Sequence, residues 1–463
     1  MSHQKHSTNW SASGFELTRR RLLATTAGIG GLSLPSFLQM QSLAASNGGA
    51  ASGKAKSCII LFCWGGMSHL DSLDLKPEAP VEIRGEFAPI DSIVPGIQIG
   101  EHLPKLARHT DKLAIIRSIS HDDGFHGRGM YWNLTGHKPP RVANIAPMRD
   151  DWPSITAVIS KFRSSPRGVP NAVRMPYPMV DNETLQAGED GGWLGVKYDP
   201  IVLRPASGTP YEGSSKTLGA EVLKLHDVDQ DRLASRRELL TSLRNTERLS
   251  TDYESFEHFQ SLAKDILGGT ALQHAYNFDN ESPKVRESYG THIAGQSLLL
   301  ARRMTEAGVP VVQVCCGPGD LGGGRDTWDT HGNNFNHLKN RLLPVFDHTA
   351  SALLQDLSDR GTLDETLVVI LTDFGRTPRI NANAGRDHYP NVYSVAFAGG
   401  GIRGGQVYGS SDSNAAFALS HPCSPPDVHA TIFNALGIDP KAELRDMLNR
   451  PFPISDGDVL PLS

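Results

Sequence analysis

Short, continuous apolar segments constrain the fold of this chain more than any other feature. The segment Cys58–Trp64 is entirely apolar and ends at two glycines, which is the pattern of a strand buried on both faces. Similar segments follow at 113–117, 310–316, 366–372 and 392–398. Amphipathic stretches lie between several of them, and 338–360 places its apolar residues at helical spacing. This alternation predicts an α/β fold, with a largely parallel central sheet flanked by helices.

Two internal regions depart from this alternation. Residues 229–307 are charge-rich and helix-periodic, which predicts a helical insertion over one edge of the sheet. Residues 166–220 are rich in proline and glycine and are expected to be mostly loop. The 463 residues would allow two or three domains, but one large α/β domain over 57–463 with this insertion fits equally well, and we expect that arrangement.

The composition excludes several classes of protein. With 39% hydrophobic and 21% charged residues, the chain is neither disordered nor fibrous. A net charge of -5 leaves no electrostatic footprint for nucleic acid, so DNA and RNA are not expected as partners. Five cysteines, four of them in or beside strand-like segments and none in a C-x-x-C pattern, are interpreted as buried thiols.

The N-terminus has the features of a twin-arginine export signal. Arg19 and Arg20 precede an uncharged stretch over 22–40, and Ser42-Leu43-Ala44 then matches a small-x-small cleavage site. We therefore expect a signal peptide over 1–45, a linker over 46–56, and a periplasmic or extracellular protein. The alternative, a basic terminus ahead of a buried helix, does not explain this order. No other apolar run approaches the roughly 20 residues of a membrane span, so no transmembrane segment is expected in the mature chain.

Metal-ligand side chains follow several of the predicted strands. Asp329 and His331 lie in the loop after 310–316, Asp373 directly follows 366–372, and His388 comes shortly after it. Open α/β sheets collect their functional groups in such strand-end loops. Carboxylates and neutral imidazoles bind divalent cations, so these residues predict a shared metal site.

Two further clusters contain carboxylate, imidazole or guanidinium side chains. Asp71 and Asp74 follow the first strand and are interpreted either as metal ligands or as caps of a turn. His121, His126 and Arg128 lie within eight residues ahead of a predicted helix, where they form an anion cradle or a solvated loop. Arg128, with Arg376 and Arg386, is a candidate bidentate donor to an oxyanion, although each arginine is also consistent with a salt bridge.

These motifs resemble the DUF1501 family within the alkaline phosphatase and sulfatase superfamily. The motifs are Gly65-Gly66-Met67-Ser68-His69-Leu70-Asp71, Trp328-Asp329-Thr330-His331-Gly332-Asn333-Asn334, Phe374-Gly375-Arg376-Thr377-Pro378 and Gly385-Arg386-Asp387-His388. The resemblance implies a divalent cation, either zinc, calcium or manganese, and a small-molecule or polysaccharide ester of phosphate or sulfate as substrate. By the same resemblance the ligands would be Asp71 or Asp74, Asp329, His331, Asp373 and His388.

The chain departs from the pattern of that superfamily at two positions. His126 stands where sulfatases carry a Cys or Ser nucleophile, and Phe374 stands where a metal-binding histidine is expected. We therefore expect at most one tightly held cation and a water nucleophile activated by it, with His126 or His121 as general acid or base. The alternative is a catalytically silent protein that binds an anionic polysaccharide or a protein partner.

Overall fold

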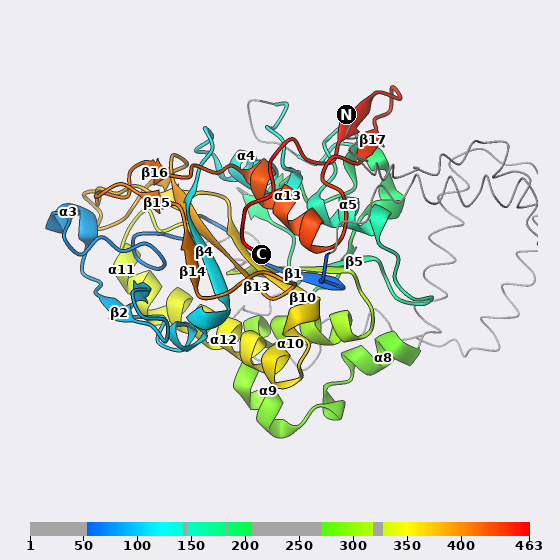
Figure 1. Ribbon diagram of the computed structural model, residues 1–463, viewed down its shortest axis with the longest axis horizontal. Helices are drawn as coiled ribbons and strands as arrows, with labels where there is room; N and C mark the ends of the chain where they lie inside the picture. Colours follow the sequence, from blue (N-terminus) through cyan, green and yellow to red (C-terminus); the bar gives the residue numbers. More distant parts are fainter. Residues whose placement is uncertain (1–52, 142–145, 182–183, 206–269, 318–326) are drawn as a thin grey trace, which may run out of the picture. The chain divides into compact units, whose positions relative to one another are not determined.

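The computed structural model describes residues 53–141, 146–181, 184–205, 270–317 and 327–463, all within the unit Ala50–Ser463 (Figure 1). The predicted signal peptide, 1–45, lies outside the described residues. So do 206–269, which contain most of the predicted insertion.

An eight-stranded sheet forms the centre of this unit. Its spatial order is β14-β4-β13-β10-β1-β9-β5-β8. The strands, in that order, are Gln406–Tyr408, Leu113–Ile119, Tyr393–Ala398, Thr366–Thr372, Ser57–Cys63, Val311–Cys316, Ala172–Met175 and Ile201–Val202. All neighbouring pairs are parallel except those of β13, which runs antiparallel to both β10 and β4. The predicted α/β fold with a largely parallel sheet is confirmed.

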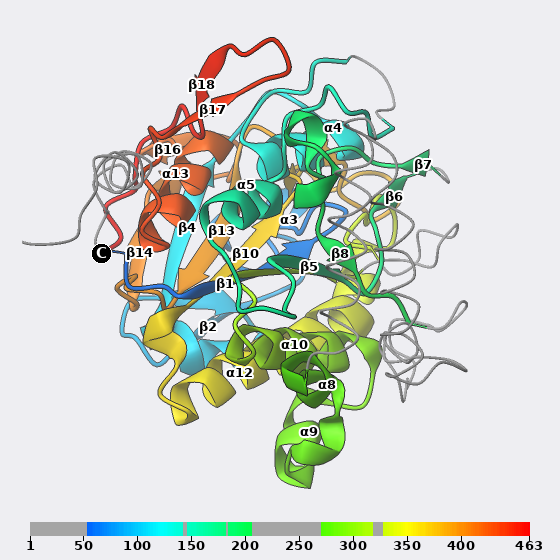
Figure 2. The same ribbon diagram turned by 90° about the vertical axis from the view of Figure 1, so that its right-hand side faces the viewer.

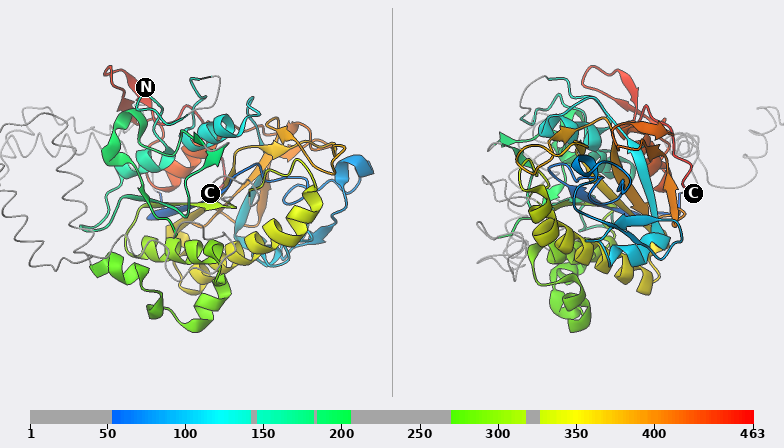
Figure 3. Two further views of the ribbon diagram at one scale, coloured as in Figure 1. Left: turned by 180° about the vertical axis from the view of Figure 1, so that it is seen from behind. Right: turned by 90° about the vertical axis from the view of Figure 1, so that its left-hand side faces the viewer.

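Helices cover both faces of the sheet, and the alternation along β1 shows why. Ile59 and Leu61 pack into the apolar cluster of α10 and α12, whereas Ile60 and Phe62 pack into that of α4, α5 and α13. These helices are α4 His126–Thr135, α5 Ile155–Phe162, α10 Ile293–Glu306, α12 Leu343–Asp359 and α13 Pro425–Ala435. The two layers lie on opposite sides of the sheet in Figures 1, 2 and 3. A strand with both faces covered has to be apolar throughout, as β1 is.

The remaining elements are short. The helices are α3 Val81–Arg84, α8 Thr270–Tyr276, α9 Pro283–Tyr289 and α11 Asn334–His337. The strands pair as β2 Pro89–Asp91 with β3 Gln98–Gly100, β6 Val180–Asp181 with β7 Thr184–Leu185, β11 Gly375–Arg376 with β12 His388–Tyr389, β15 Ser410–Ser411 with β16 Ala418–Ser420, and β17 Glu443–Arg445 with β18 Pro451–Pro453. Within the predicted insertion, the described residues 270–307 are mostly helical, and α10 packs directly on the sheet.

All five cysteines are buried and none forms a disulfide, as the interpretation of buried thiols requires. In the described part of the chain, no helix combines the length and the hydropathy that crossing a bilayer requires.

Candidate metal centre

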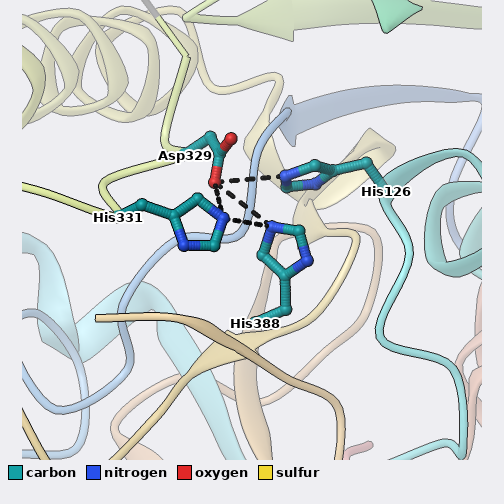
Figure 4. A group of neighbouring side chains, drawn as sticks. All are labelled: His126, Asp329, His331 and His388. Carbon is teal, nitrogen blue, oxygen red and sulfur yellow. Dashed lines mark hydrogen bonds and ion pairs between the residues drawn. The ribbon is translucent and has the colours of Figure 1, made fainter. Parts of the chain in front are cut away.

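Four side chains meet at one edge of the sheet. The ligand atoms of His126, Asp329, His331 and His388 all lie within 4.8 Å of one another (Figure 4). Asp329 Oδ1 is 3.2 Å from His126 Nε2, 3.1 Å from His331 Nε2 and 3.3 Å from His388 Nε2. We call these four residues the metal group, because three imidazole nitrogens and one carboxylate oxygen point at a common centre.

Two of the histidines lie next to ends of antiparallel strands: His126 follows the C-terminal end of β4, and His388 precedes the N-terminal end of β13. His126 is the first residue of α4, which follows β4. His388 lies in β12, a few residues before β13. Because β13 is antiparallel to β10, its N-terminal end lies beside the C-terminal ends of the parallel strands. The antiparallel direction of β13 therefore places the segment with His388 at the same edge of the sheet as Asp329, which lies in the loop after β9.

The buried side chain of Trp328 fixes the loop that carries Asp329. Its backbone amide donates to the carbonyl of Trp64 at 2.9 Å, and its indole Nε1 donates to the carbonyl of Cys316 at 2.9 Å. The loop is thereby held against the ends of β1 and β9. Gly65, with φ of 107°, permits the close approach, because a Cβ there would lie 2.6 Å from the amide nitrogen of Asp329.

Each histidine of the metal group is held from behind through its Nδ1 atom. The pairs are His126 with the carboxylate of Asp373, His331 with Asp387 Oδ1 at 2.7 Å, and His388 with the carbonyl of Gly124 at 2.7 Å. An acceptor at Nδ1 makes that nitrogen the protonated one and leaves the Nε2 lone pair free. This arrangement of outer acceptors is what orients histidine ligands around metal ions in proteins.

Arg376 positions the carboxylate of the metal group. Its guanidinium is fully buried and donates to Asp329 Oδ1 at 2.6 Å. It also donates to the carbonyls of Gly65, of Gly66 at 3.0 Å and of Arg386 at 3.0 Å. The guanidinium therefore ties the loops after β1, β9 and β11 together, and it is committed to protein acceptors rather than open to a substrate.

The pKa of Asp329 keeps this carboxylate charged. Burial alone would raise the pKa, but the contacts with the imidazoles of His126 and His388 and the charge of Arg376 hold it well below the usual range. Asp329 is therefore ionised at any physiological pH, as a metal ligand has to be.

The environment of His126 attracts positive charge. Burial alone would lower its pKa, but the carboxylates of Asp373 and Asp329 raise the pKa to about 9. In the described part of the chain, its buried Nε2 atom has no hydrogen-bond partner. A cation among the three Nε2 atoms and Asp329 Oδ1 would satisfy that nitrogen, so the side chains fit a metal ion. His331 is 45% exposed and Asp329 32%, which leaves the group accessible from solvent on that side.

A family model matches residues 55–462 of the chain, that of the protein of unknown function DUF1501. The chain belongs to the DUF1501 family. This confirms the resemblance that the strand-end motifs indicated. No curated protein matches the sequence of this DUF1501 chain.

Several solved structures are distantly similar to the DUF1501 chain. They include a 2-O GAG sulfatase, at 11% identity over 83% of this chain and 71% of that one, with a TM-score of 0.35. A phosphonate monoester hydrolase from Silicibacter pomeroyi has 13% identity over 88% and 76%, with a TM-score of 0.35. An alkaline phosphatase from the Antarctic bacterium TAB5 has 13% identity over 79% and 96%, with a TM-score of 0.34. At such distances the site itself has to indicate the function.

Asp71, considered as a metal ligand in the sequence, lies in a buried ion pair of the DUF1501 chain instead. Arg386 donates to its two oxygens at 2.8 and 3.1 Å, and both side chains are fully buried. Ser68 and Asn334 donate to the same carboxylate at 2.6 and 3.0 Å. Its lone pairs are thus used within the protein, which corrects the ligand assignment of Asp71 and the oxyanion role of Arg386.

Asp74 and Asp373 also lie outside the metal group. Asp74 accepts from Lys76 at 2.9 Å and from Ser411, and it lies 3.6 Å from Arg117 Nε. The fully buried Asp373 stands behind His126 and contacts its Nδ1 atom, so it supports the metal group from outside. Both differ from their predicted ligand roles, because each carboxylate is used by a nearer donor.

The two remaining predicted catalytic residues are engaged elsewhere. His121 is buried, with Nε2 2.7 Å from the carbonyl of Asp373 and Nδ1 accepting from the amide of Asp123 at 3.2 Å. Arg128 donates to the carboxylate of Asp123 and to the carbonyl of Arg141. With these contacts, His121 has no ring nitrogen left for proton transfer and Arg128 faces its own loop.

Phe374 forms the floor of the metal group. It is fully buried, stacks on His126 with ring centroids 4.9 Å apart, and lies 4.7 Å from the ring of His388. The ring therefore supports the imidazoles from the protein side and leaves the solvent side clear.

Sequence reasoning missed two outer acceptors, Asp387 and the carbonyl of Gly124. Asp387 stands next to His388 in the sequence but contacts His331, 56 residues away, so its role left no local signal. The carbonyl of Gly124 left no signal, because any residue supplies a backbone acceptor.

Proposed function

We propose that this DUF1501 protein is a metal-dependent hydrolase of phosphate or sulfate esters, with water as the nucleophile. The observation that carries the proposal is the group of three imidazoles and one carboxylate, each imidazole oriented through Nδ1 by an outer acceptor. The motif resemblance to alkaline phosphatases and sulfatases supports the substrate class, which is a small-molecule or polysaccharide ester.

The donor set favours a transition metal. Three imidazole nitrogens and one carboxylate suit zinc or manganese, whereas calcium takes six to eight oxygen ligands. His126, Asp329, His331 and His388 would hold the cation. A bound divalent cation polarises an ester oxygen and lowers the pKa of water toward neutrality.

The protein contributes geometry to the reaction. Asp373, Asp387 and the carbonyl of Gly124 fix the imidazoles, and Arg376 fixes Asp329. In the hydrolysis, the oxygen of water bonds to phosphorus or sulfur and the bond to the ester oxygen breaks. One proton of the water ends on the released alcohol, and the other stays on the acid product or goes to solvent.

Water as the nucleophile is supported by the engagement of two nearby threonine hydroxyls in other hydrogen bonds. Thr330 donates to Asn334 Oδ1 at 2.6 Å, and Thr372 donates to the carbonyl of Cys63 at 2.8 Å. The first residue of α4 is His126, a member of the metal group. Neither hydroxyl is therefore poised to attack an ester, and His126 supports metal binding rather than the proton transfer inferred from the sequence.

A rival function is a catalytically silent binding protein, and a Phe374 ring that plugged the cleft would favour it. The burial of this ring beneath the histidines removes that argument. The deciding experiment is turnover of aryl phosphates and aryl sulfates by the full chain loaded with zinc or manganese. Hydrolysis that disappears in His388→Ala and persists in His421→Ala, an exposed histidine outside the metal group, would support the hydrolase. Inertness of the metal-loaded protein on every ester would favour the binding protein.

We also propose export by the twin-arginine route, on the strength of Arg19-Arg20 and the small-residue site Ser42-Leu43-Ala44. Replacing both arginines by lysine keeps the charge and should trap the precursor in the cytoplasm. Unchanged export of that double variant would contradict the proposal.

A further inference from the structure

The three arginines that were candidates for binding an oxyanion are all committed to protein acceptors. The guanidiniums of Arg376 and Arg386 are fully buried. Arg386 binds Asp71 and the carbonyls of Thr377, Pro378 and Ile83, and Arg128 binds Asp123 and the carbonyl of Arg141. Arg376 binds Asp329 and three carbonyls. A substrate at the metal group therefore meets none of these guanidiniums as a free cation.

The side-chain charges around the metal group also leave little positive charge for a substrate. Asp329 places its carboxylate beside all three imidazoles, Asp373 contacts His126 and Asp387 contacts His331. Arg376 supplies one guanidinium. The carboxylate of Asp387 is 53% exposed and lies at the rim of the metal group. The carboxylates exceed the guanidinium by two charges, which is the charge that a divalent cation brings. Counting the described residues alone, the loaded site would be close to neutral.

From these contacts we infer that the substrate is a singly charged tetrahedral ester, a phosphodiester or a sulfate monoester, and not a doubly charged phosphate monoester. The inference rests on the proposed function and narrows it. A site that is near neutral with its cation bound offers little net positive charge to balance a second negative charge on the substrate. Among the described residues, none of the three candidate arginines is free to pair with the second negative charge of a phosphate monoester, which would also face Asp387 at the rim.

The magnitude follows from the missing contact. A hydrogen bond to a charged group is worth enough that its absence changes an equilibrium by roughly ten-fold or more. We therefore expect kcat/KM for the singly charged esters to exceed that for the monoester by at least about ten-fold above pH 7. Below the second ionisation of a phosphate monoester, at about pH 6, the monoester becomes singly charged and the gap should narrow.

The experiment uses the zinc-loaded full chain and three esters with the same aryl leaving group: an aryl sulfate, an aryl methyl phosphate and an aryl phosphate. Their kcat/KM values are measured from pH 5 to 8, with the monoester expressed relative to the diester so that ionisations of the protein cancel. A second readout is calorimetric binding of dimethyl phosphate and methyl phosphate, which carry one and two charges at pH 8. The ratio of kcat/KM for the aryl sulfate to that for the aryl methyl phosphate tells whether the site prefers a sulfate monoester or a phosphodiester.

The outcomes separate the inference from the proposed function. Preference for singly charged esters, with tighter binding of dimethyl phosphate, supports the inference. A monoester that is hydrolysed equally well or better overturns it and leaves the hydrolase intact. Arg379 is exposed and no hydrogen bond or ion pair in the described residues joins it to the metal group, so Arg379→Ala is the matched control. A monoester preference that Arg379→Ala abolishes would identify an overlooked cation and also overturn the inference. Inertness on all three esters would overturn the proposed function itself.

Discussion

The Nε2 atoms of His331 and His388 lie 2.8 Å apart at the edge of the sheet. The Nδ1 atom of each ring has its own acceptor, Asp387 for His331 and the carbonyl of Gly124 for His388. Both rings therefore turn the same nitrogen toward the other. Two imidazoles presented in this way suit a shared cation better than a mutual hydrogen bond, since each ring already has its proton on Nδ1.

Metal content tests this arrangement directly. We expect one equivalent of zinc or manganese per chain and a loss of that metal in His331→Ala and His388→Ala, because each substitution removes one of four ligands. His421→Ala, outside the metal group, should retain it. Elemental analysis of protein purified without chelator gives the result. Two equivalents per chain would show that carboxylates outside the metal group also bind metal.

We expect Asp373 to act through His126 rather than on the metal. Asp373→Asn keeps the shape of the side chain but removes the charge that holds the His126 ring. We expect metal affinity to fall by roughly 10- to 100-fold, as for other outer acceptors of histidine ligands. The measurement is metal affinity by competition with a chelator. An unchanged affinity, with far-UV circular dichroism also unchanged, would show that Asp373 is not a positioning residue.

Much of this arrangement could be predicted from sequence, because apolar strand segments and the ligand-type residues that follow them are visible in short stretches of the chain. The apolar segments at 57–63 and 366–372 are strands because a strand covered by helices on both faces has to be apolar. Asp329, His331 and His388 come close together because strand ends of one sheet share an edge.

The roles of Asp71 and Asp373 could not be predicted, because a carboxylate after a strand looks the same whether it binds a metal, an arginine or a histidine. Asp71 and Arg386 are separated by 315 residues. Asp373 and His126 are separated by 247. Only the packing of distant loops decides which donor each carboxylate meets.

The buried pair of Asp71 and Arg386 should matter for stability rather than for metal content. Asp71→Asn leaves a fully buried guanidinium without its counter-charge, which typically costs about 3–5 kcal/mol. The free energy of unfolding in urea measures this cost. The double variant Asp71→Leu, Arg386→Met removes both charges and should be less destabilised than Asp71→Asn. If Asp71→Asn instead lost metal at unchanged stability, Asp71 would be a ligand after all.

His429 gives the fold a dependence on pH that is independent of the metal group. Burial lowers its pKa to about 4, while its Nε2 atom lies 2.8 Å from the carbonyl of Asn133. The unfolded chain, with a pKa of about 6.5, binds the proton more readily. Stability from His429 is therefore complete above pH 6.5 and is lost as the pH falls toward 4, by roughly 3 kcal/mol.

The measurement compares unfolding free energies of wild type and His429→Gln between pH 4.5 and 7. Glutamine does not titrate and can still donate to the carbonyl of Asn133, so the variant should lose less stability on acidification. The exposed His421→Gln serves as control. Parallel pH profiles of wild type and His429→Gln would show that another group is responsible.

Phe125 should contact the leaving group of the substrate. It is 71% exposed, although it precedes His126 and follows Gly124, both of which contribute to the metal group or its support. An aromatic ring held in water beside a reactive site is available to pack against an apolar or sugar moiety. We expect Phe125→Ala to raise KM for aryl esters by up to about ten-fold, the effect of losing part of a buried phenylalanine contact, with metal content unchanged. Leu448→Ala, equally exposed at 73% on the turn between β17 and β18, is the matched control. An equal effect on a methyl ester, whose small leaving group offers little surface to an aromatic ring, would place Phe125 in the support of His126 instead.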